Sequence, residues 1–518
     1  MVLRPWLAHY DPGVPYSIEY PSFPLTHFLE ESARKFPSHP CTIFQRRIIT
    51  YHQMNTLTDG MAIAMSELGI EKGDRVGILL PNTPQFVLTF FATHKAGGIV
   101  VAIDSRFTVP EIIEKINDSG IKILVLSSER YPELKTAQPK TTIQTLVVTD
   151  PDELMNQDLL HKGEAGQETG KICPVSLEEG DFWLLDLIAR YRRNDHPGWK
   201  ISQEDVAIFQ YTGGTTGTSK AALATHRNLV ANTLQFRHWL PSLQEGKEVI
   251  LAAIPLYHVY GMVLGMLLGV FIGAPLILVA NARNMNELLE NIQEYKPTIF
   301  PGVPLLYHAL SNHADVKAGK YSLKSLKVCI SGSAPLMPGT KESFEALIGG
   351  KIIEGYGLSE APTATHCNPQ HGVNKIGSIG MPLPDVDARV VKLEDGEKDV
   401  EIGELGELII SSPQVMTGYN DKPEETARTL RTLRDGKVWL FTGDMVRMDE
   451  DGYLFVIDRV KELIKPGGYQ VWPREVEEVL TQYPKIMEAG VAGIPDPYRG
   501  ETVKAWIVLK PGETTTEE

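Results

Sequence analysis

The sequence predicts an α/β protein with a large N-terminal domain of stacked α/β sheets, a distorted antiparallel β subdomain and a small α+β C-terminal domain. Between residues 75 and 126, apolar strand-like runs alternate with helical segments through short links, which indicates β-α-β units and a parallel sheet. From Val386 the pattern changes to short strands separated by Gly-Glu turns, which favours an antiparallel arrangement. A chain of 518 residues is also too long for one hydrophobic core, so at least two domains are expected.

The elements of the first half follow in chain order. Residues up to about 24 are rich in proline and aromatic side chains and are expected to form an extended surface arm. A helix precedes an edge strand at residues 41–44. Residues 84–96 form a helix with Thr83 and Pro84 at its start, between strands 75–80 and 99–103. A helix at 110–119 and a strand at 123–126 continue the alternation, whereas residues 150–196 are interpreted as a surface loop or insertion.

The second half ends in a separate small domain. Strands are expected at 298–300 and 328–331, then a helix from Pro473 and strands at 489–493 and 504–509. The chain ends in a segment typical of a helix N-cap, so this domain is expected to be truncated. The predicted division is residues 1–458, a hinge at 459–464 and a partial domain at 465–518.

Composition limits the classes of partner. The formal net charge of −15 argues against a nucleic-acid partner, which would favour a basic face. No signal peptide is apparent, so a cytoplasmic protein is expected. Residues 261–280 are uncharged and carry glycines at four-residue intervals, but a Gly-Ala-Pro break favours a buried helix, whose glycine face leaves open space beside it, over a membrane span. Four scattered cysteines are interpreted as reduced core residues: Cys41, Cys173, Cys329 and Cys367.

A glycine- and threonine-rich loop at residues 210–220 is the strongest chemical signal. Its glycines let N–H groups approach an anion closely, its hydroxyls add neutral donors, and Lys220 adds a point charge. It is not a Walker loop, because Ser219 stands where glycine is required and Ala221 follows the lysine. A flexible turn between strand 206–209 and a helix near 229–234 is the alternative. The predicted phosphate-binding residues are Thr212, Gly213, Gly214, Thr215, Thr216, Gly217 and Lys220.

Two further segments suggest nucleotide binding. Glycines on both sides of Tyr356 allow its ring to lie against a planar base, and Glu360 is a hard carboxylate suited to Mg²⁺. A turn with a core tyrosine is the alternative. Asp444, after strand 438–441, is expected on a tight turn, where its carboxylate can accept both hydroxyls of a ribose or simply stabilise the turn.

These segments together resemble the acyl-adenylate-forming superfamily of acyl-CoA synthetases, peptide-synthetase adenylation domains and luciferases. The loop resembles the YTSGTTGxPKG signature, with Gly213, Ser219 and Ala221 replacing its serine, proline and last glycine. The first replacement resembles the long-chain fatty acyl-CoA synthetase branch. Residues 355–360 resemble the YGxTE motif with serine for threonine, and residues 442–444 match TGD. The resemblance covers residues from about 25 to 509.

The resemblance implies roles for the site residues. Tyr356 would stack on adenine, Glu360 and Thr216 would bind the metal ion, and Asp444 would bind the ribose. His258 would lie beside the substrate carboxylate in a positioning role, although a lone histidine is more often a satisfied core residue. The other residues implied in nucleotide or thiol binding and in the hinge are Gly332, Ser333, Ala334, Gly355, Gly357, Ser359, Arg459, Lys461, Gly467 and Gly468.

The reaction implied is ATP-dependent activation of a fatty, long-chain carboxylic acid through an acyl-AMP intermediate, followed by transfer to coenzyme A. We hypothesise that helix 261–272 borders an apolar tunnel for the fatty tail. Replacing Gly265 with Phe should then shorten the preferred acyl chain. No segment after Leu509 matches the family's C-terminal catalytic lysine, so adenylation is expected to be impaired or the chain to be shortened. A medium-chain or aryl-CoA ligase and an acyl-adenylate-binding protein without full turnover are the alternatives. Peripheral membrane contact and a homodimer are compatible with the sequence.

Overall fold

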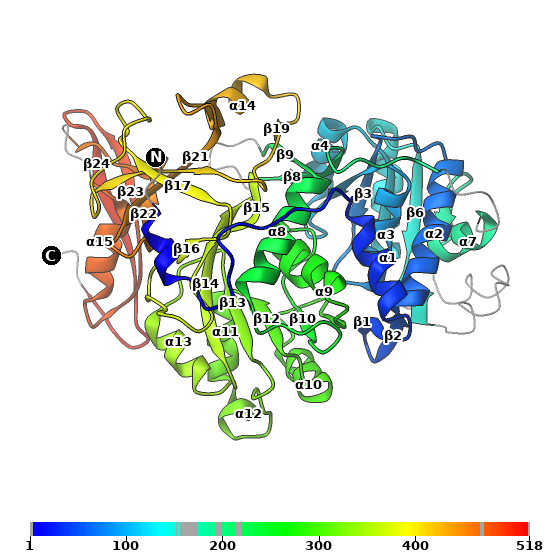
Figure 1. Cartoon of the computed structure of the whole chain (residues 1–518), viewed down its shortest axis with the longest axis horizontal. Coiled ribbons are helices and arrows are strands. Elements are labelled where there is room, and N and C mark those ends of the chain that lie inside the picture. Colours follow the sequence, from blue (N-terminus) through cyan, green and yellow to red (C-terminus); the bar gives the residue numbers. More distant parts are fainter. Residues whose placement is uncertain are drawn as a thin grey trace.

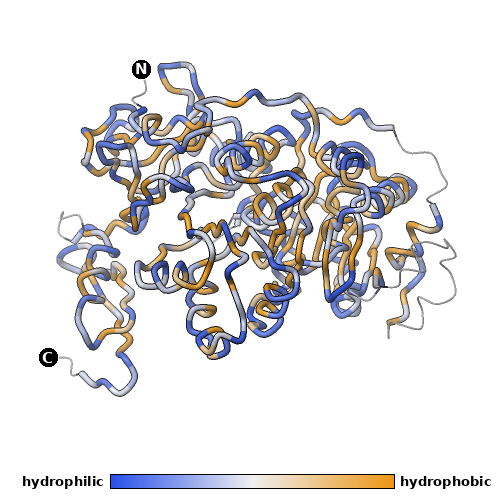
Figure 2. Tube along the Cα trace, turned by 60° about the horizontal axis from the view of Figure 1, so that its bottom comes forward, coloured by the Kyte–Doolittle hydropathy of each residue, from blue (hydrophilic) through white to orange (hydrophobic). Residues whose placement is uncertain are grey.

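The computed structural model describes residues 4–151, 153–155, 175–191, 198–212, 219–466 and 471–515. Two large sheets lie next to each other, an antiparallel sheet packs beside the second, and a two-stranded sheet occupies one end of the molecule (Figure 1). Hydrophobic segments concentrate in the interior of the two large sheets, and hydrophilic segments lie mostly at the periphery (Figure 2). The predicted α/β class with an antiparallel part is confirmed.

The eight-stranded sheet contains the predicted β-α-β units. Its central strands run parallel, because helices connect them, and all residues of α3 are buried. In spatial order its strands are β19 (Gly418–Tyr419), β9 (Ala221–Thr225), β8 (Val206–Tyr211), β4 (Ile99–Ala102), β3 (Arg75–Leu79), β5 (Ile121–Ser127), β6 (Thr145–Thr149) and β7 (Phe182–Trp183). The associated helices are α2 (Tyr51–Glu67), α3 (Pro84–Lys95), α4 (Val109–Ser119), η2 (Ser128–Arg130), α5 (Tyr131–Ala137), η3 (Gln138–Lys140), η4 (Glu153–Met155) and α7 (Leu184–Tyr191).

The interpretation of residues 150–196 as a loop is wrong for its described parts. Strand β7 pairs with β6 and continues the sheet, and α7 packs against α2 with four buried residues. The charge-rich surroundings concealed these two short elements in the sequence. Residues 152, 156–174 and 192–197 of this stretch lie outside the described ranges.

The nine-stranded sheet combines parallel strands with antiparallel edges. The strand predicted at 41–44 forms, but it is not an edge strand, because β1 pairs with β11 on one side and with β2 on the other. In order the strands are β16 (Met381–Pro382), β15 (Ala361–Cys367), β14 (Lys351–Leu358), β13 (Val328–Ser331), β12 (Ile299–Gly302), β10 (Ile250–Ala252), β11 (Leu276–Leu278), β1 (Pro40–Phe44) and β2 (Arg47–Thr50). Its helices are α1 (Thr26–Lys35), α8 (His226–Trp239), α10 (Met285–Tyr295), α11 (Pro304–Asn312), α12 (Ala314–Lys317) and α13 (Pro338–Glu345).

The remaining sheets are antiparallel, as predicted. The five-stranded one contains β17 (Asp387–Val391), β18 (Leu405–Ser411), β20 (Leu430–Thr432), β21 (Val438–Met448) and β22 (Leu454–Arg459), with α14 (Pro423–Thr429) before β20. After the short helix η7 (Val460–Glu462), the C-terminal part consists of α15 (Pro473–Thr481), β23 (Ile486–Asp496) and β24 (Gly500–Leu509). The predicted helix from Pro473 and the two following strands are confirmed.

The N-terminal arm is anchored at several points along its length. It begins with η1 (Pro5–His9), whose Trp6 is buried. The Tyr10 hydroxyl then donates to the Pro382 carbonyl, and the Ile18 N–H donates to the Asp385 carboxylate. These contacts tie the arm to the segment that leads from β16 to β17.

The glycine-rich segment is buried in the nine-stranded sheet's core. It forms a π-helix, η6 (Gly261–Leu267), continued by α9 (Leu268–Phe271). A Cβ on Gly261 would lie 2.3 Å from the Pro255 carbonyl oxygen, and one on Gly269 would lie 2.4 Å from Leu276 Cδ2. The expectation that this face leaves open space is therefore wrong, because the glycines allow close packing instead. Within the described ranges, no helix is both long and apolar enough to cross a bilayer.

Three of the four cysteines match their predicted place in the core. Cys41, Cys329 and Cys367 are buried and free, and burial raises the pKa of each thiol. Cys173 lies outside the described residues.

Candidate active site

The glycine-rich loop connects two antiparallel strands. Tyr211 pairs with Ala221, so the loop closes a hairpin between β8 and β9. The alternative prediction, a flexible turn that joins a strand directly to a helix, is therefore wrong. At its base the Thr212 N–H donates to the Lys220 carbonyl at 2.9 Å, and the Ser219 hydroxyl donates to the Thr212 carbonyl at 2.7 Å. The loop residues Gly213, Gly214, Thr215, Thr216 and Gly217 lie outside the described residues.

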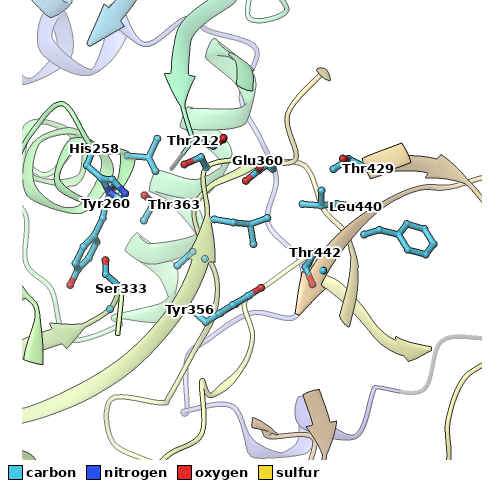
Figure 3. A pocket seen from close by; sticks show the side chains of 18 of the residues that line it. Thr212, His258, Tyr260, Ser333, Tyr356, Glu360, Thr363, Thr429, Leu440 and Thr442 are labelled. Atoms are coloured by element: carbon cyan, nitrogen blue, oxygen red, sulfur yellow. Dashed lines mark hydrogen bonds between the residues drawn. The ribbon is translucent and has the colours of Figure 1, made fainter. Parts of the chain in front are cut away.

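A cavity of about 770 Å³ lies where this hairpin meets the other two sheets, within the size range of small-molecule sites. Figure 3 shows its lining side chains converging from elements far apart in the sequence. Ala334 and Asp444 are not among the lining residues, but Asp444 contacts two residues that are, Tyr356 and Arg459. The predicted site residues that do line it are Thr212, Lys220, His258, Gly332, Ser333, Gly355, Tyr356, Gly357, Ser359, Glu360, Arg459 and Lys461.

Asp444 is held between Tyr356 and Arg459. The Tyr356 hydroxyl donates a hydrogen bond to one carboxylate oxygen, and Arg459 Nε lies 3.2 Å from the other. Burial raises the pKa of Asp444, against the lowering effect of these two partners. Asp444 therefore holds its buried acceptor oxygens directly behind two residues that line the cavity.

The expected tight turn at Asp444 is wrong, because the residue lies inside strand β21 and pairs with Arg459 on β22. Gly443 has a φ of +73°, and the register with β22 shifts between Met445 and Val446. The register with β18 also shifts between Phe441 and Met445, so the glycine marks an irregular point within a strand.

Lys220 and Glu360 share a neighbour, Tyr419. The Tyr419 hydroxyl donates to Glu360 Oε1 at 2.7 Å, and Lys220 Nζ lies 5.2 Å from the centre of the Tyr419 ring. Lys220 Nζ also lies 2.6 Å from Glu425 Oε2. The ammonium and the carboxylate predicted for phosphate and metal thus face one part of the cavity.

His258 lies beside Tyr260 at one side of the cavity, with Thr429 and Leu440 at the other (Figure 3). Its Nδ1 accepts the Tyr260 N–H at 3.2 Å, and burial lowers the pKa of its imidazole. The Tyr260 hydroxyl donates to the carbonyls of Gly302 and Ile330, which fixes the ring against Gly332. A neutral, fixed imidazole suits a positioning role better than proton transfer.

Comparison with known families accounts for this convergence. Residues 29–420 match the AMP-binding enzyme family, and residues 475–518 match the AMP-binding enzyme C-terminal domain. The chain belongs to the AMP-binding enzyme family.

Curated relatives align with this chain over nearly its whole length. The long-chain-fatty-acid–CoA ligase of Bacillus subtilis is 38% identical, covering 99% of this chain and 91% of that protein. The ligase of the same name from Yersinia pestis is 32% identical, covering 99% and 90%.

Solved structures give the same fold. A long-chain-fatty-acid–CoA ligase from Archaeoglobus fulgidus superimposes with a TM-score of 0.74 at 26% identity, covering 97% of this chain and 93% of that one. ATP-bound MatB from Rhodopseudomonas palustris gives 0.79 at 26% identity, covering 95% and 90%.

Several residues that line this cavity had no signal in the sequence. Glu407 accepts the Gly443 N–H at 3.0 Å, and burial raises the pKa of its carboxyl group. It falls in the Gly-Glu stretch interpreted as turns, although β18 begins at Leu405. Tyr419 and Glu425 reach the site only because folding brings β19 and α14 against the hairpin.

Proposed function

We propose that this chain activates a long-chain fatty acid with ATP, forming an acyl-AMP and pyrophosphate, and then transfers the acyl group to coenzyme A with release of AMP. One observation carries the proposal: a single cavity brings together Lys220, Tyr356 and Glu360 in a chain that aligns over 99% of its length with a long-chain-fatty-acid–CoA ligase. A carboxylate is a poor acyl donor, and attaching AMP supplies the leaving group that thioester formation needs.

The proposed first step needs positioning and charge neutralisation more than acid–base chemistry. A carboxylate oxygen of the fatty acid attacks the α-phosphorus, and the bond to the departing pyrophosphate oxygen breaks. Lys220 neutralises charge on the β- and γ-phosphates, Tyr356 stacks on the adenine, and Asp444 accepts the ribose hydroxyls. His258, neutral in its buried position, orients the fatty-acid carboxylate. In the second step the thiol sulfur attacks the acyl carbon and AMP departs.

Glu360 suits a magnesium ion that ATP brings with it. In the described ranges, no cluster of three or more acidic, histidine or cysteine side chains could hold a metal ion on its own. Mg²⁺ commonly uses one or two carboxylates together with waters and substrate phosphates, so a single carboxylate beside the phosphate-binding lysine fits. When bound there, the ion would offset the charge of the phosphates. The other predicted metal-binding residue, Thr216, lies outside the described residues.

The acyl chain is proposed to lie along the apolar part of the cavity. This part is lined by Phe236 on α8, by Val259, and by Leu264 on η6. A Cβ added to Gly265 would lie 3.8 Å from side-chain atoms of Ala252 and Leu256. Gly265 therefore faces β10 and not the cavity. Leu264 is therefore the better position on this helix at which to alter chain length.

The domain division is proposed as it follows from the sequence. Residues 459–464 would form the hinge, with Lys461 lining the cavity from it and the C-terminal part from 465 onward moving between the two steps. Gly467 and Gly468, proposed to line the path of the thiol, lie outside the described residues. In an intact chain, Lys461→Pro should spare acyl-AMP formation but block the thioester step, and normal acyl-CoA yield would count against the hinge.

The deciding test measures AMP release and product mass with acids of increasing chain length and with aromatic acids. A maximum at long chains is expected, whereas a maximum with aromatic or medium-chain acids would overturn the substrate class. Pyrophosphate exchange with ATP, compared with conversion of pre-made acyl-AMP and coenzyme A, separates a full synthetase from an acyl-adenylate-binding protein. Absence of affinity for both ATP and an acyl-sulfamoyl mimic of the intermediate would refute the whole proposal.

Two predictions about surroundings accompany the proposal. Peripheral membrane contact is tested by co-sedimentation with phospholipid vesicles, and a homodimer by light scattering of the purified protein. Failure of the protein to sediment with vesicles, or a monomer mass, would remove the respective prediction.

A further inference from the structure

The two charged groups proposed for phosphate and magnesium are both engaged by one segment of the chain. Glu425 on α14 pairs with Lys220 at 2.6 Å, and Tyr419 on β19 donates to Glu360 at 2.7 Å. The Lys220 side chain is only 17% exposed, whereas Glu425 is 36% exposed. The pair is therefore largely shielded on the lysine side and open to solvent on the glutamate side.

The segment is held firmly against the phosphate hairpin. Strand β19 pairs with β9, which places Tyr419 opposite Ala222, two residues beyond Lys220. The Tyr419 N–H donates to the Thr426 hydroxyl at 2.9 Å, which ties α14 back to β19. Glu425 thus reaches Lys220 from a fixed helix.

We propose that Glu425 occupies, in the nucleotide-free protein, the position at Lys220 that the β- and γ-phosphates of ATP take. Glu425 thereby sets the affinity for ligands that carry these phosphates. This inference rests on the proposed function, because Lys220 is assigned to the phosphates there. A lysine ammonium is a compact point charge, so a carboxylate and a phosphate oxygen compete for it directly.

Arg428 offers the displaced carboxylate a second partner. Arg428 Nη1 lies 3.5 Å from Glu425 Oε1, the oxygen that does not contact Lys220, and it lines the same cavity. Glu425 can therefore exchange one cation for another within one turn of α14 when ATP enters. This exchange limits the free energy lost when ATP displaces Glu425 from Lys220, but it leaves a negative charge close to the polyphosphate.

The size of the effect follows from the exposure of the pair. A partly exposed ion pair contributes modestly to stability, so ATP gains only modestly in affinity when it no longer has to break the Lys220–Glu425 pair. Removal of the nearby negative charge adds to this gain. We expect the dissociation constant of ATP to fall about tenfold when the carboxylate is neutralised. AMP lacks the β- and γ-phosphates, so its dissociation constant should change less than about twofold.

The experiment is calorimetric titration of the full chain and its Glu425→Gln variant with ATP, pyrophosphate and AMP, each with magnesium. The matched control is Glu424→Gln, which removes one charge from the same helix at a side chain that is 88% exposed and does not contact Lys220. Tighter binding of ATP and pyrophosphate by Glu425→Gln alone, with AMP unchanged, supports the proposal. A gain shared with Glu424→Gln would reflect only the net charge of the helix and would overturn it.

Equal or weaker ATP binding by Glu425→Gln would also overturn the proposal, because the carboxylate would then be orienting Lys220 for phosphate and not competing with it. If Glu425→Gln does not fold, as judged by its melting temperature, Glu425→Ala replaces it with the same expected signs. Absence of ATP binding by the unaltered chain would instead refute the proposed function, so the two failures are distinguishable.

Discussion

Replacing Asp444 by asparagine tests the proposed ribose contact directly. The carboxylate would accept both ribose hydroxyls, and each hydrogen bond to a charged group contributes about 1.5–3 kcal/mol, so the two together contribute about 3–6 kcal/mol. Asparagine keeps one acceptor oxygen, and Asp444 already has partners in Tyr356 and Arg459, so only part of this energy is lost. We expect ATP binding to weaken by about 2–3 kcal/mol, or roughly 30- to 150-fold.

The assay compares ATP with 2′,3′-dideoxy-ATP by calorimetry. The dideoxy nucleotide offers no hydroxyl to Asp444, so its affinity should be the same for both proteins within about twofold. Since Arg459 is 55% exposed, water can satisfy it after the substitution, and the variant should fold. An equal loss for both nucleotides would mean that Asp444 stabilises the site without contacting the ribose, and no loss for either would remove it from the site.

Three further predictions concern packing, metal and pH. Gly269→Ala should destabilise the fold by about 1–3 kcal/mol in urea unfolding, because the new Cβ would lie 2.4 Å from Leu276, whereas Gly265→Ala, with 3.8 Å of clearance, should be neutral or slightly stabilising. Equal effects would refute the close-packing account. Glu360→Gln should remove most of the gain in ATP affinity that magnesium gives, and an unchanged gain in calorimetry would exclude Glu360 as a ligand. Burial raises the pKa of Glu153 to about 7, so this carboxyl group ionises at a lower pH in the unfolded chain than in the folded one, and the stability of the fold decreases as pH rises from about 4.5 to 7. Glu153→Gln should abolish this decrease of at most about 3 kcal/mol in the free energy of unfolding. An unaltered pH profile of stability would contradict the assignment.

Local signals were enough to predict the regular parts of the fold. The helix α3 was predicted because Thr83 and Pro84 mark a helix start before a long apolar run, and it begins where expected. Strand β9 was missed, because four of its five residues are small and buried and the run shows no alternation. The turn expected at Asp444 was also wrong. The preceding Gly443 favours a turn and does adopt a positive φ, but the pairing of β21 with β22 keeps both residues within a strand.

The site itself was predictable only where resemblance to a family supplied the connection. Tyr356 and Glu360 lie close in sequence, but their meeting with Lys220 and Asp444 depends on how three sheets pack. The Lys220–Glu425 pair spans 205 residues, and no periodicity or turn preference carries information over that separation. Pairings of this kind have to be read from the folded chain.

Buried amides on α8 explain how the three sheets keep their relative placement. Asn228 donates to the carbonyls of Pro413 and Val415, and Asn232 donates to that of Ala364, which follows Glu360 closely in β15. Gln235 donates to the Pro384 carbonyl at 2.8 Å, at the entrance to the antiparallel sheet. Such side chains are costly to bury without partners, so their bonds are satisfied in only one arrangement of these segments.

This helix contributes only Phe236 to the cavity lining, yet it fixes the segments that lead to Glu360 and Tyr419. We therefore expect substitution of Asn232 by leucine to weaken ATP binding as well as stability, since next to the site the Thr363 N–H would lose its acceptor and the Ala364 carbonyl would keep only the Gln414 amide as a side-chain donor. Unfolding in urea and calorimetry on the same preparation would measure both quantities. A variant that lost stability while binding ATP with unchanged affinity would show that the nucleotide groups are aligned by their own contacts and not by α8.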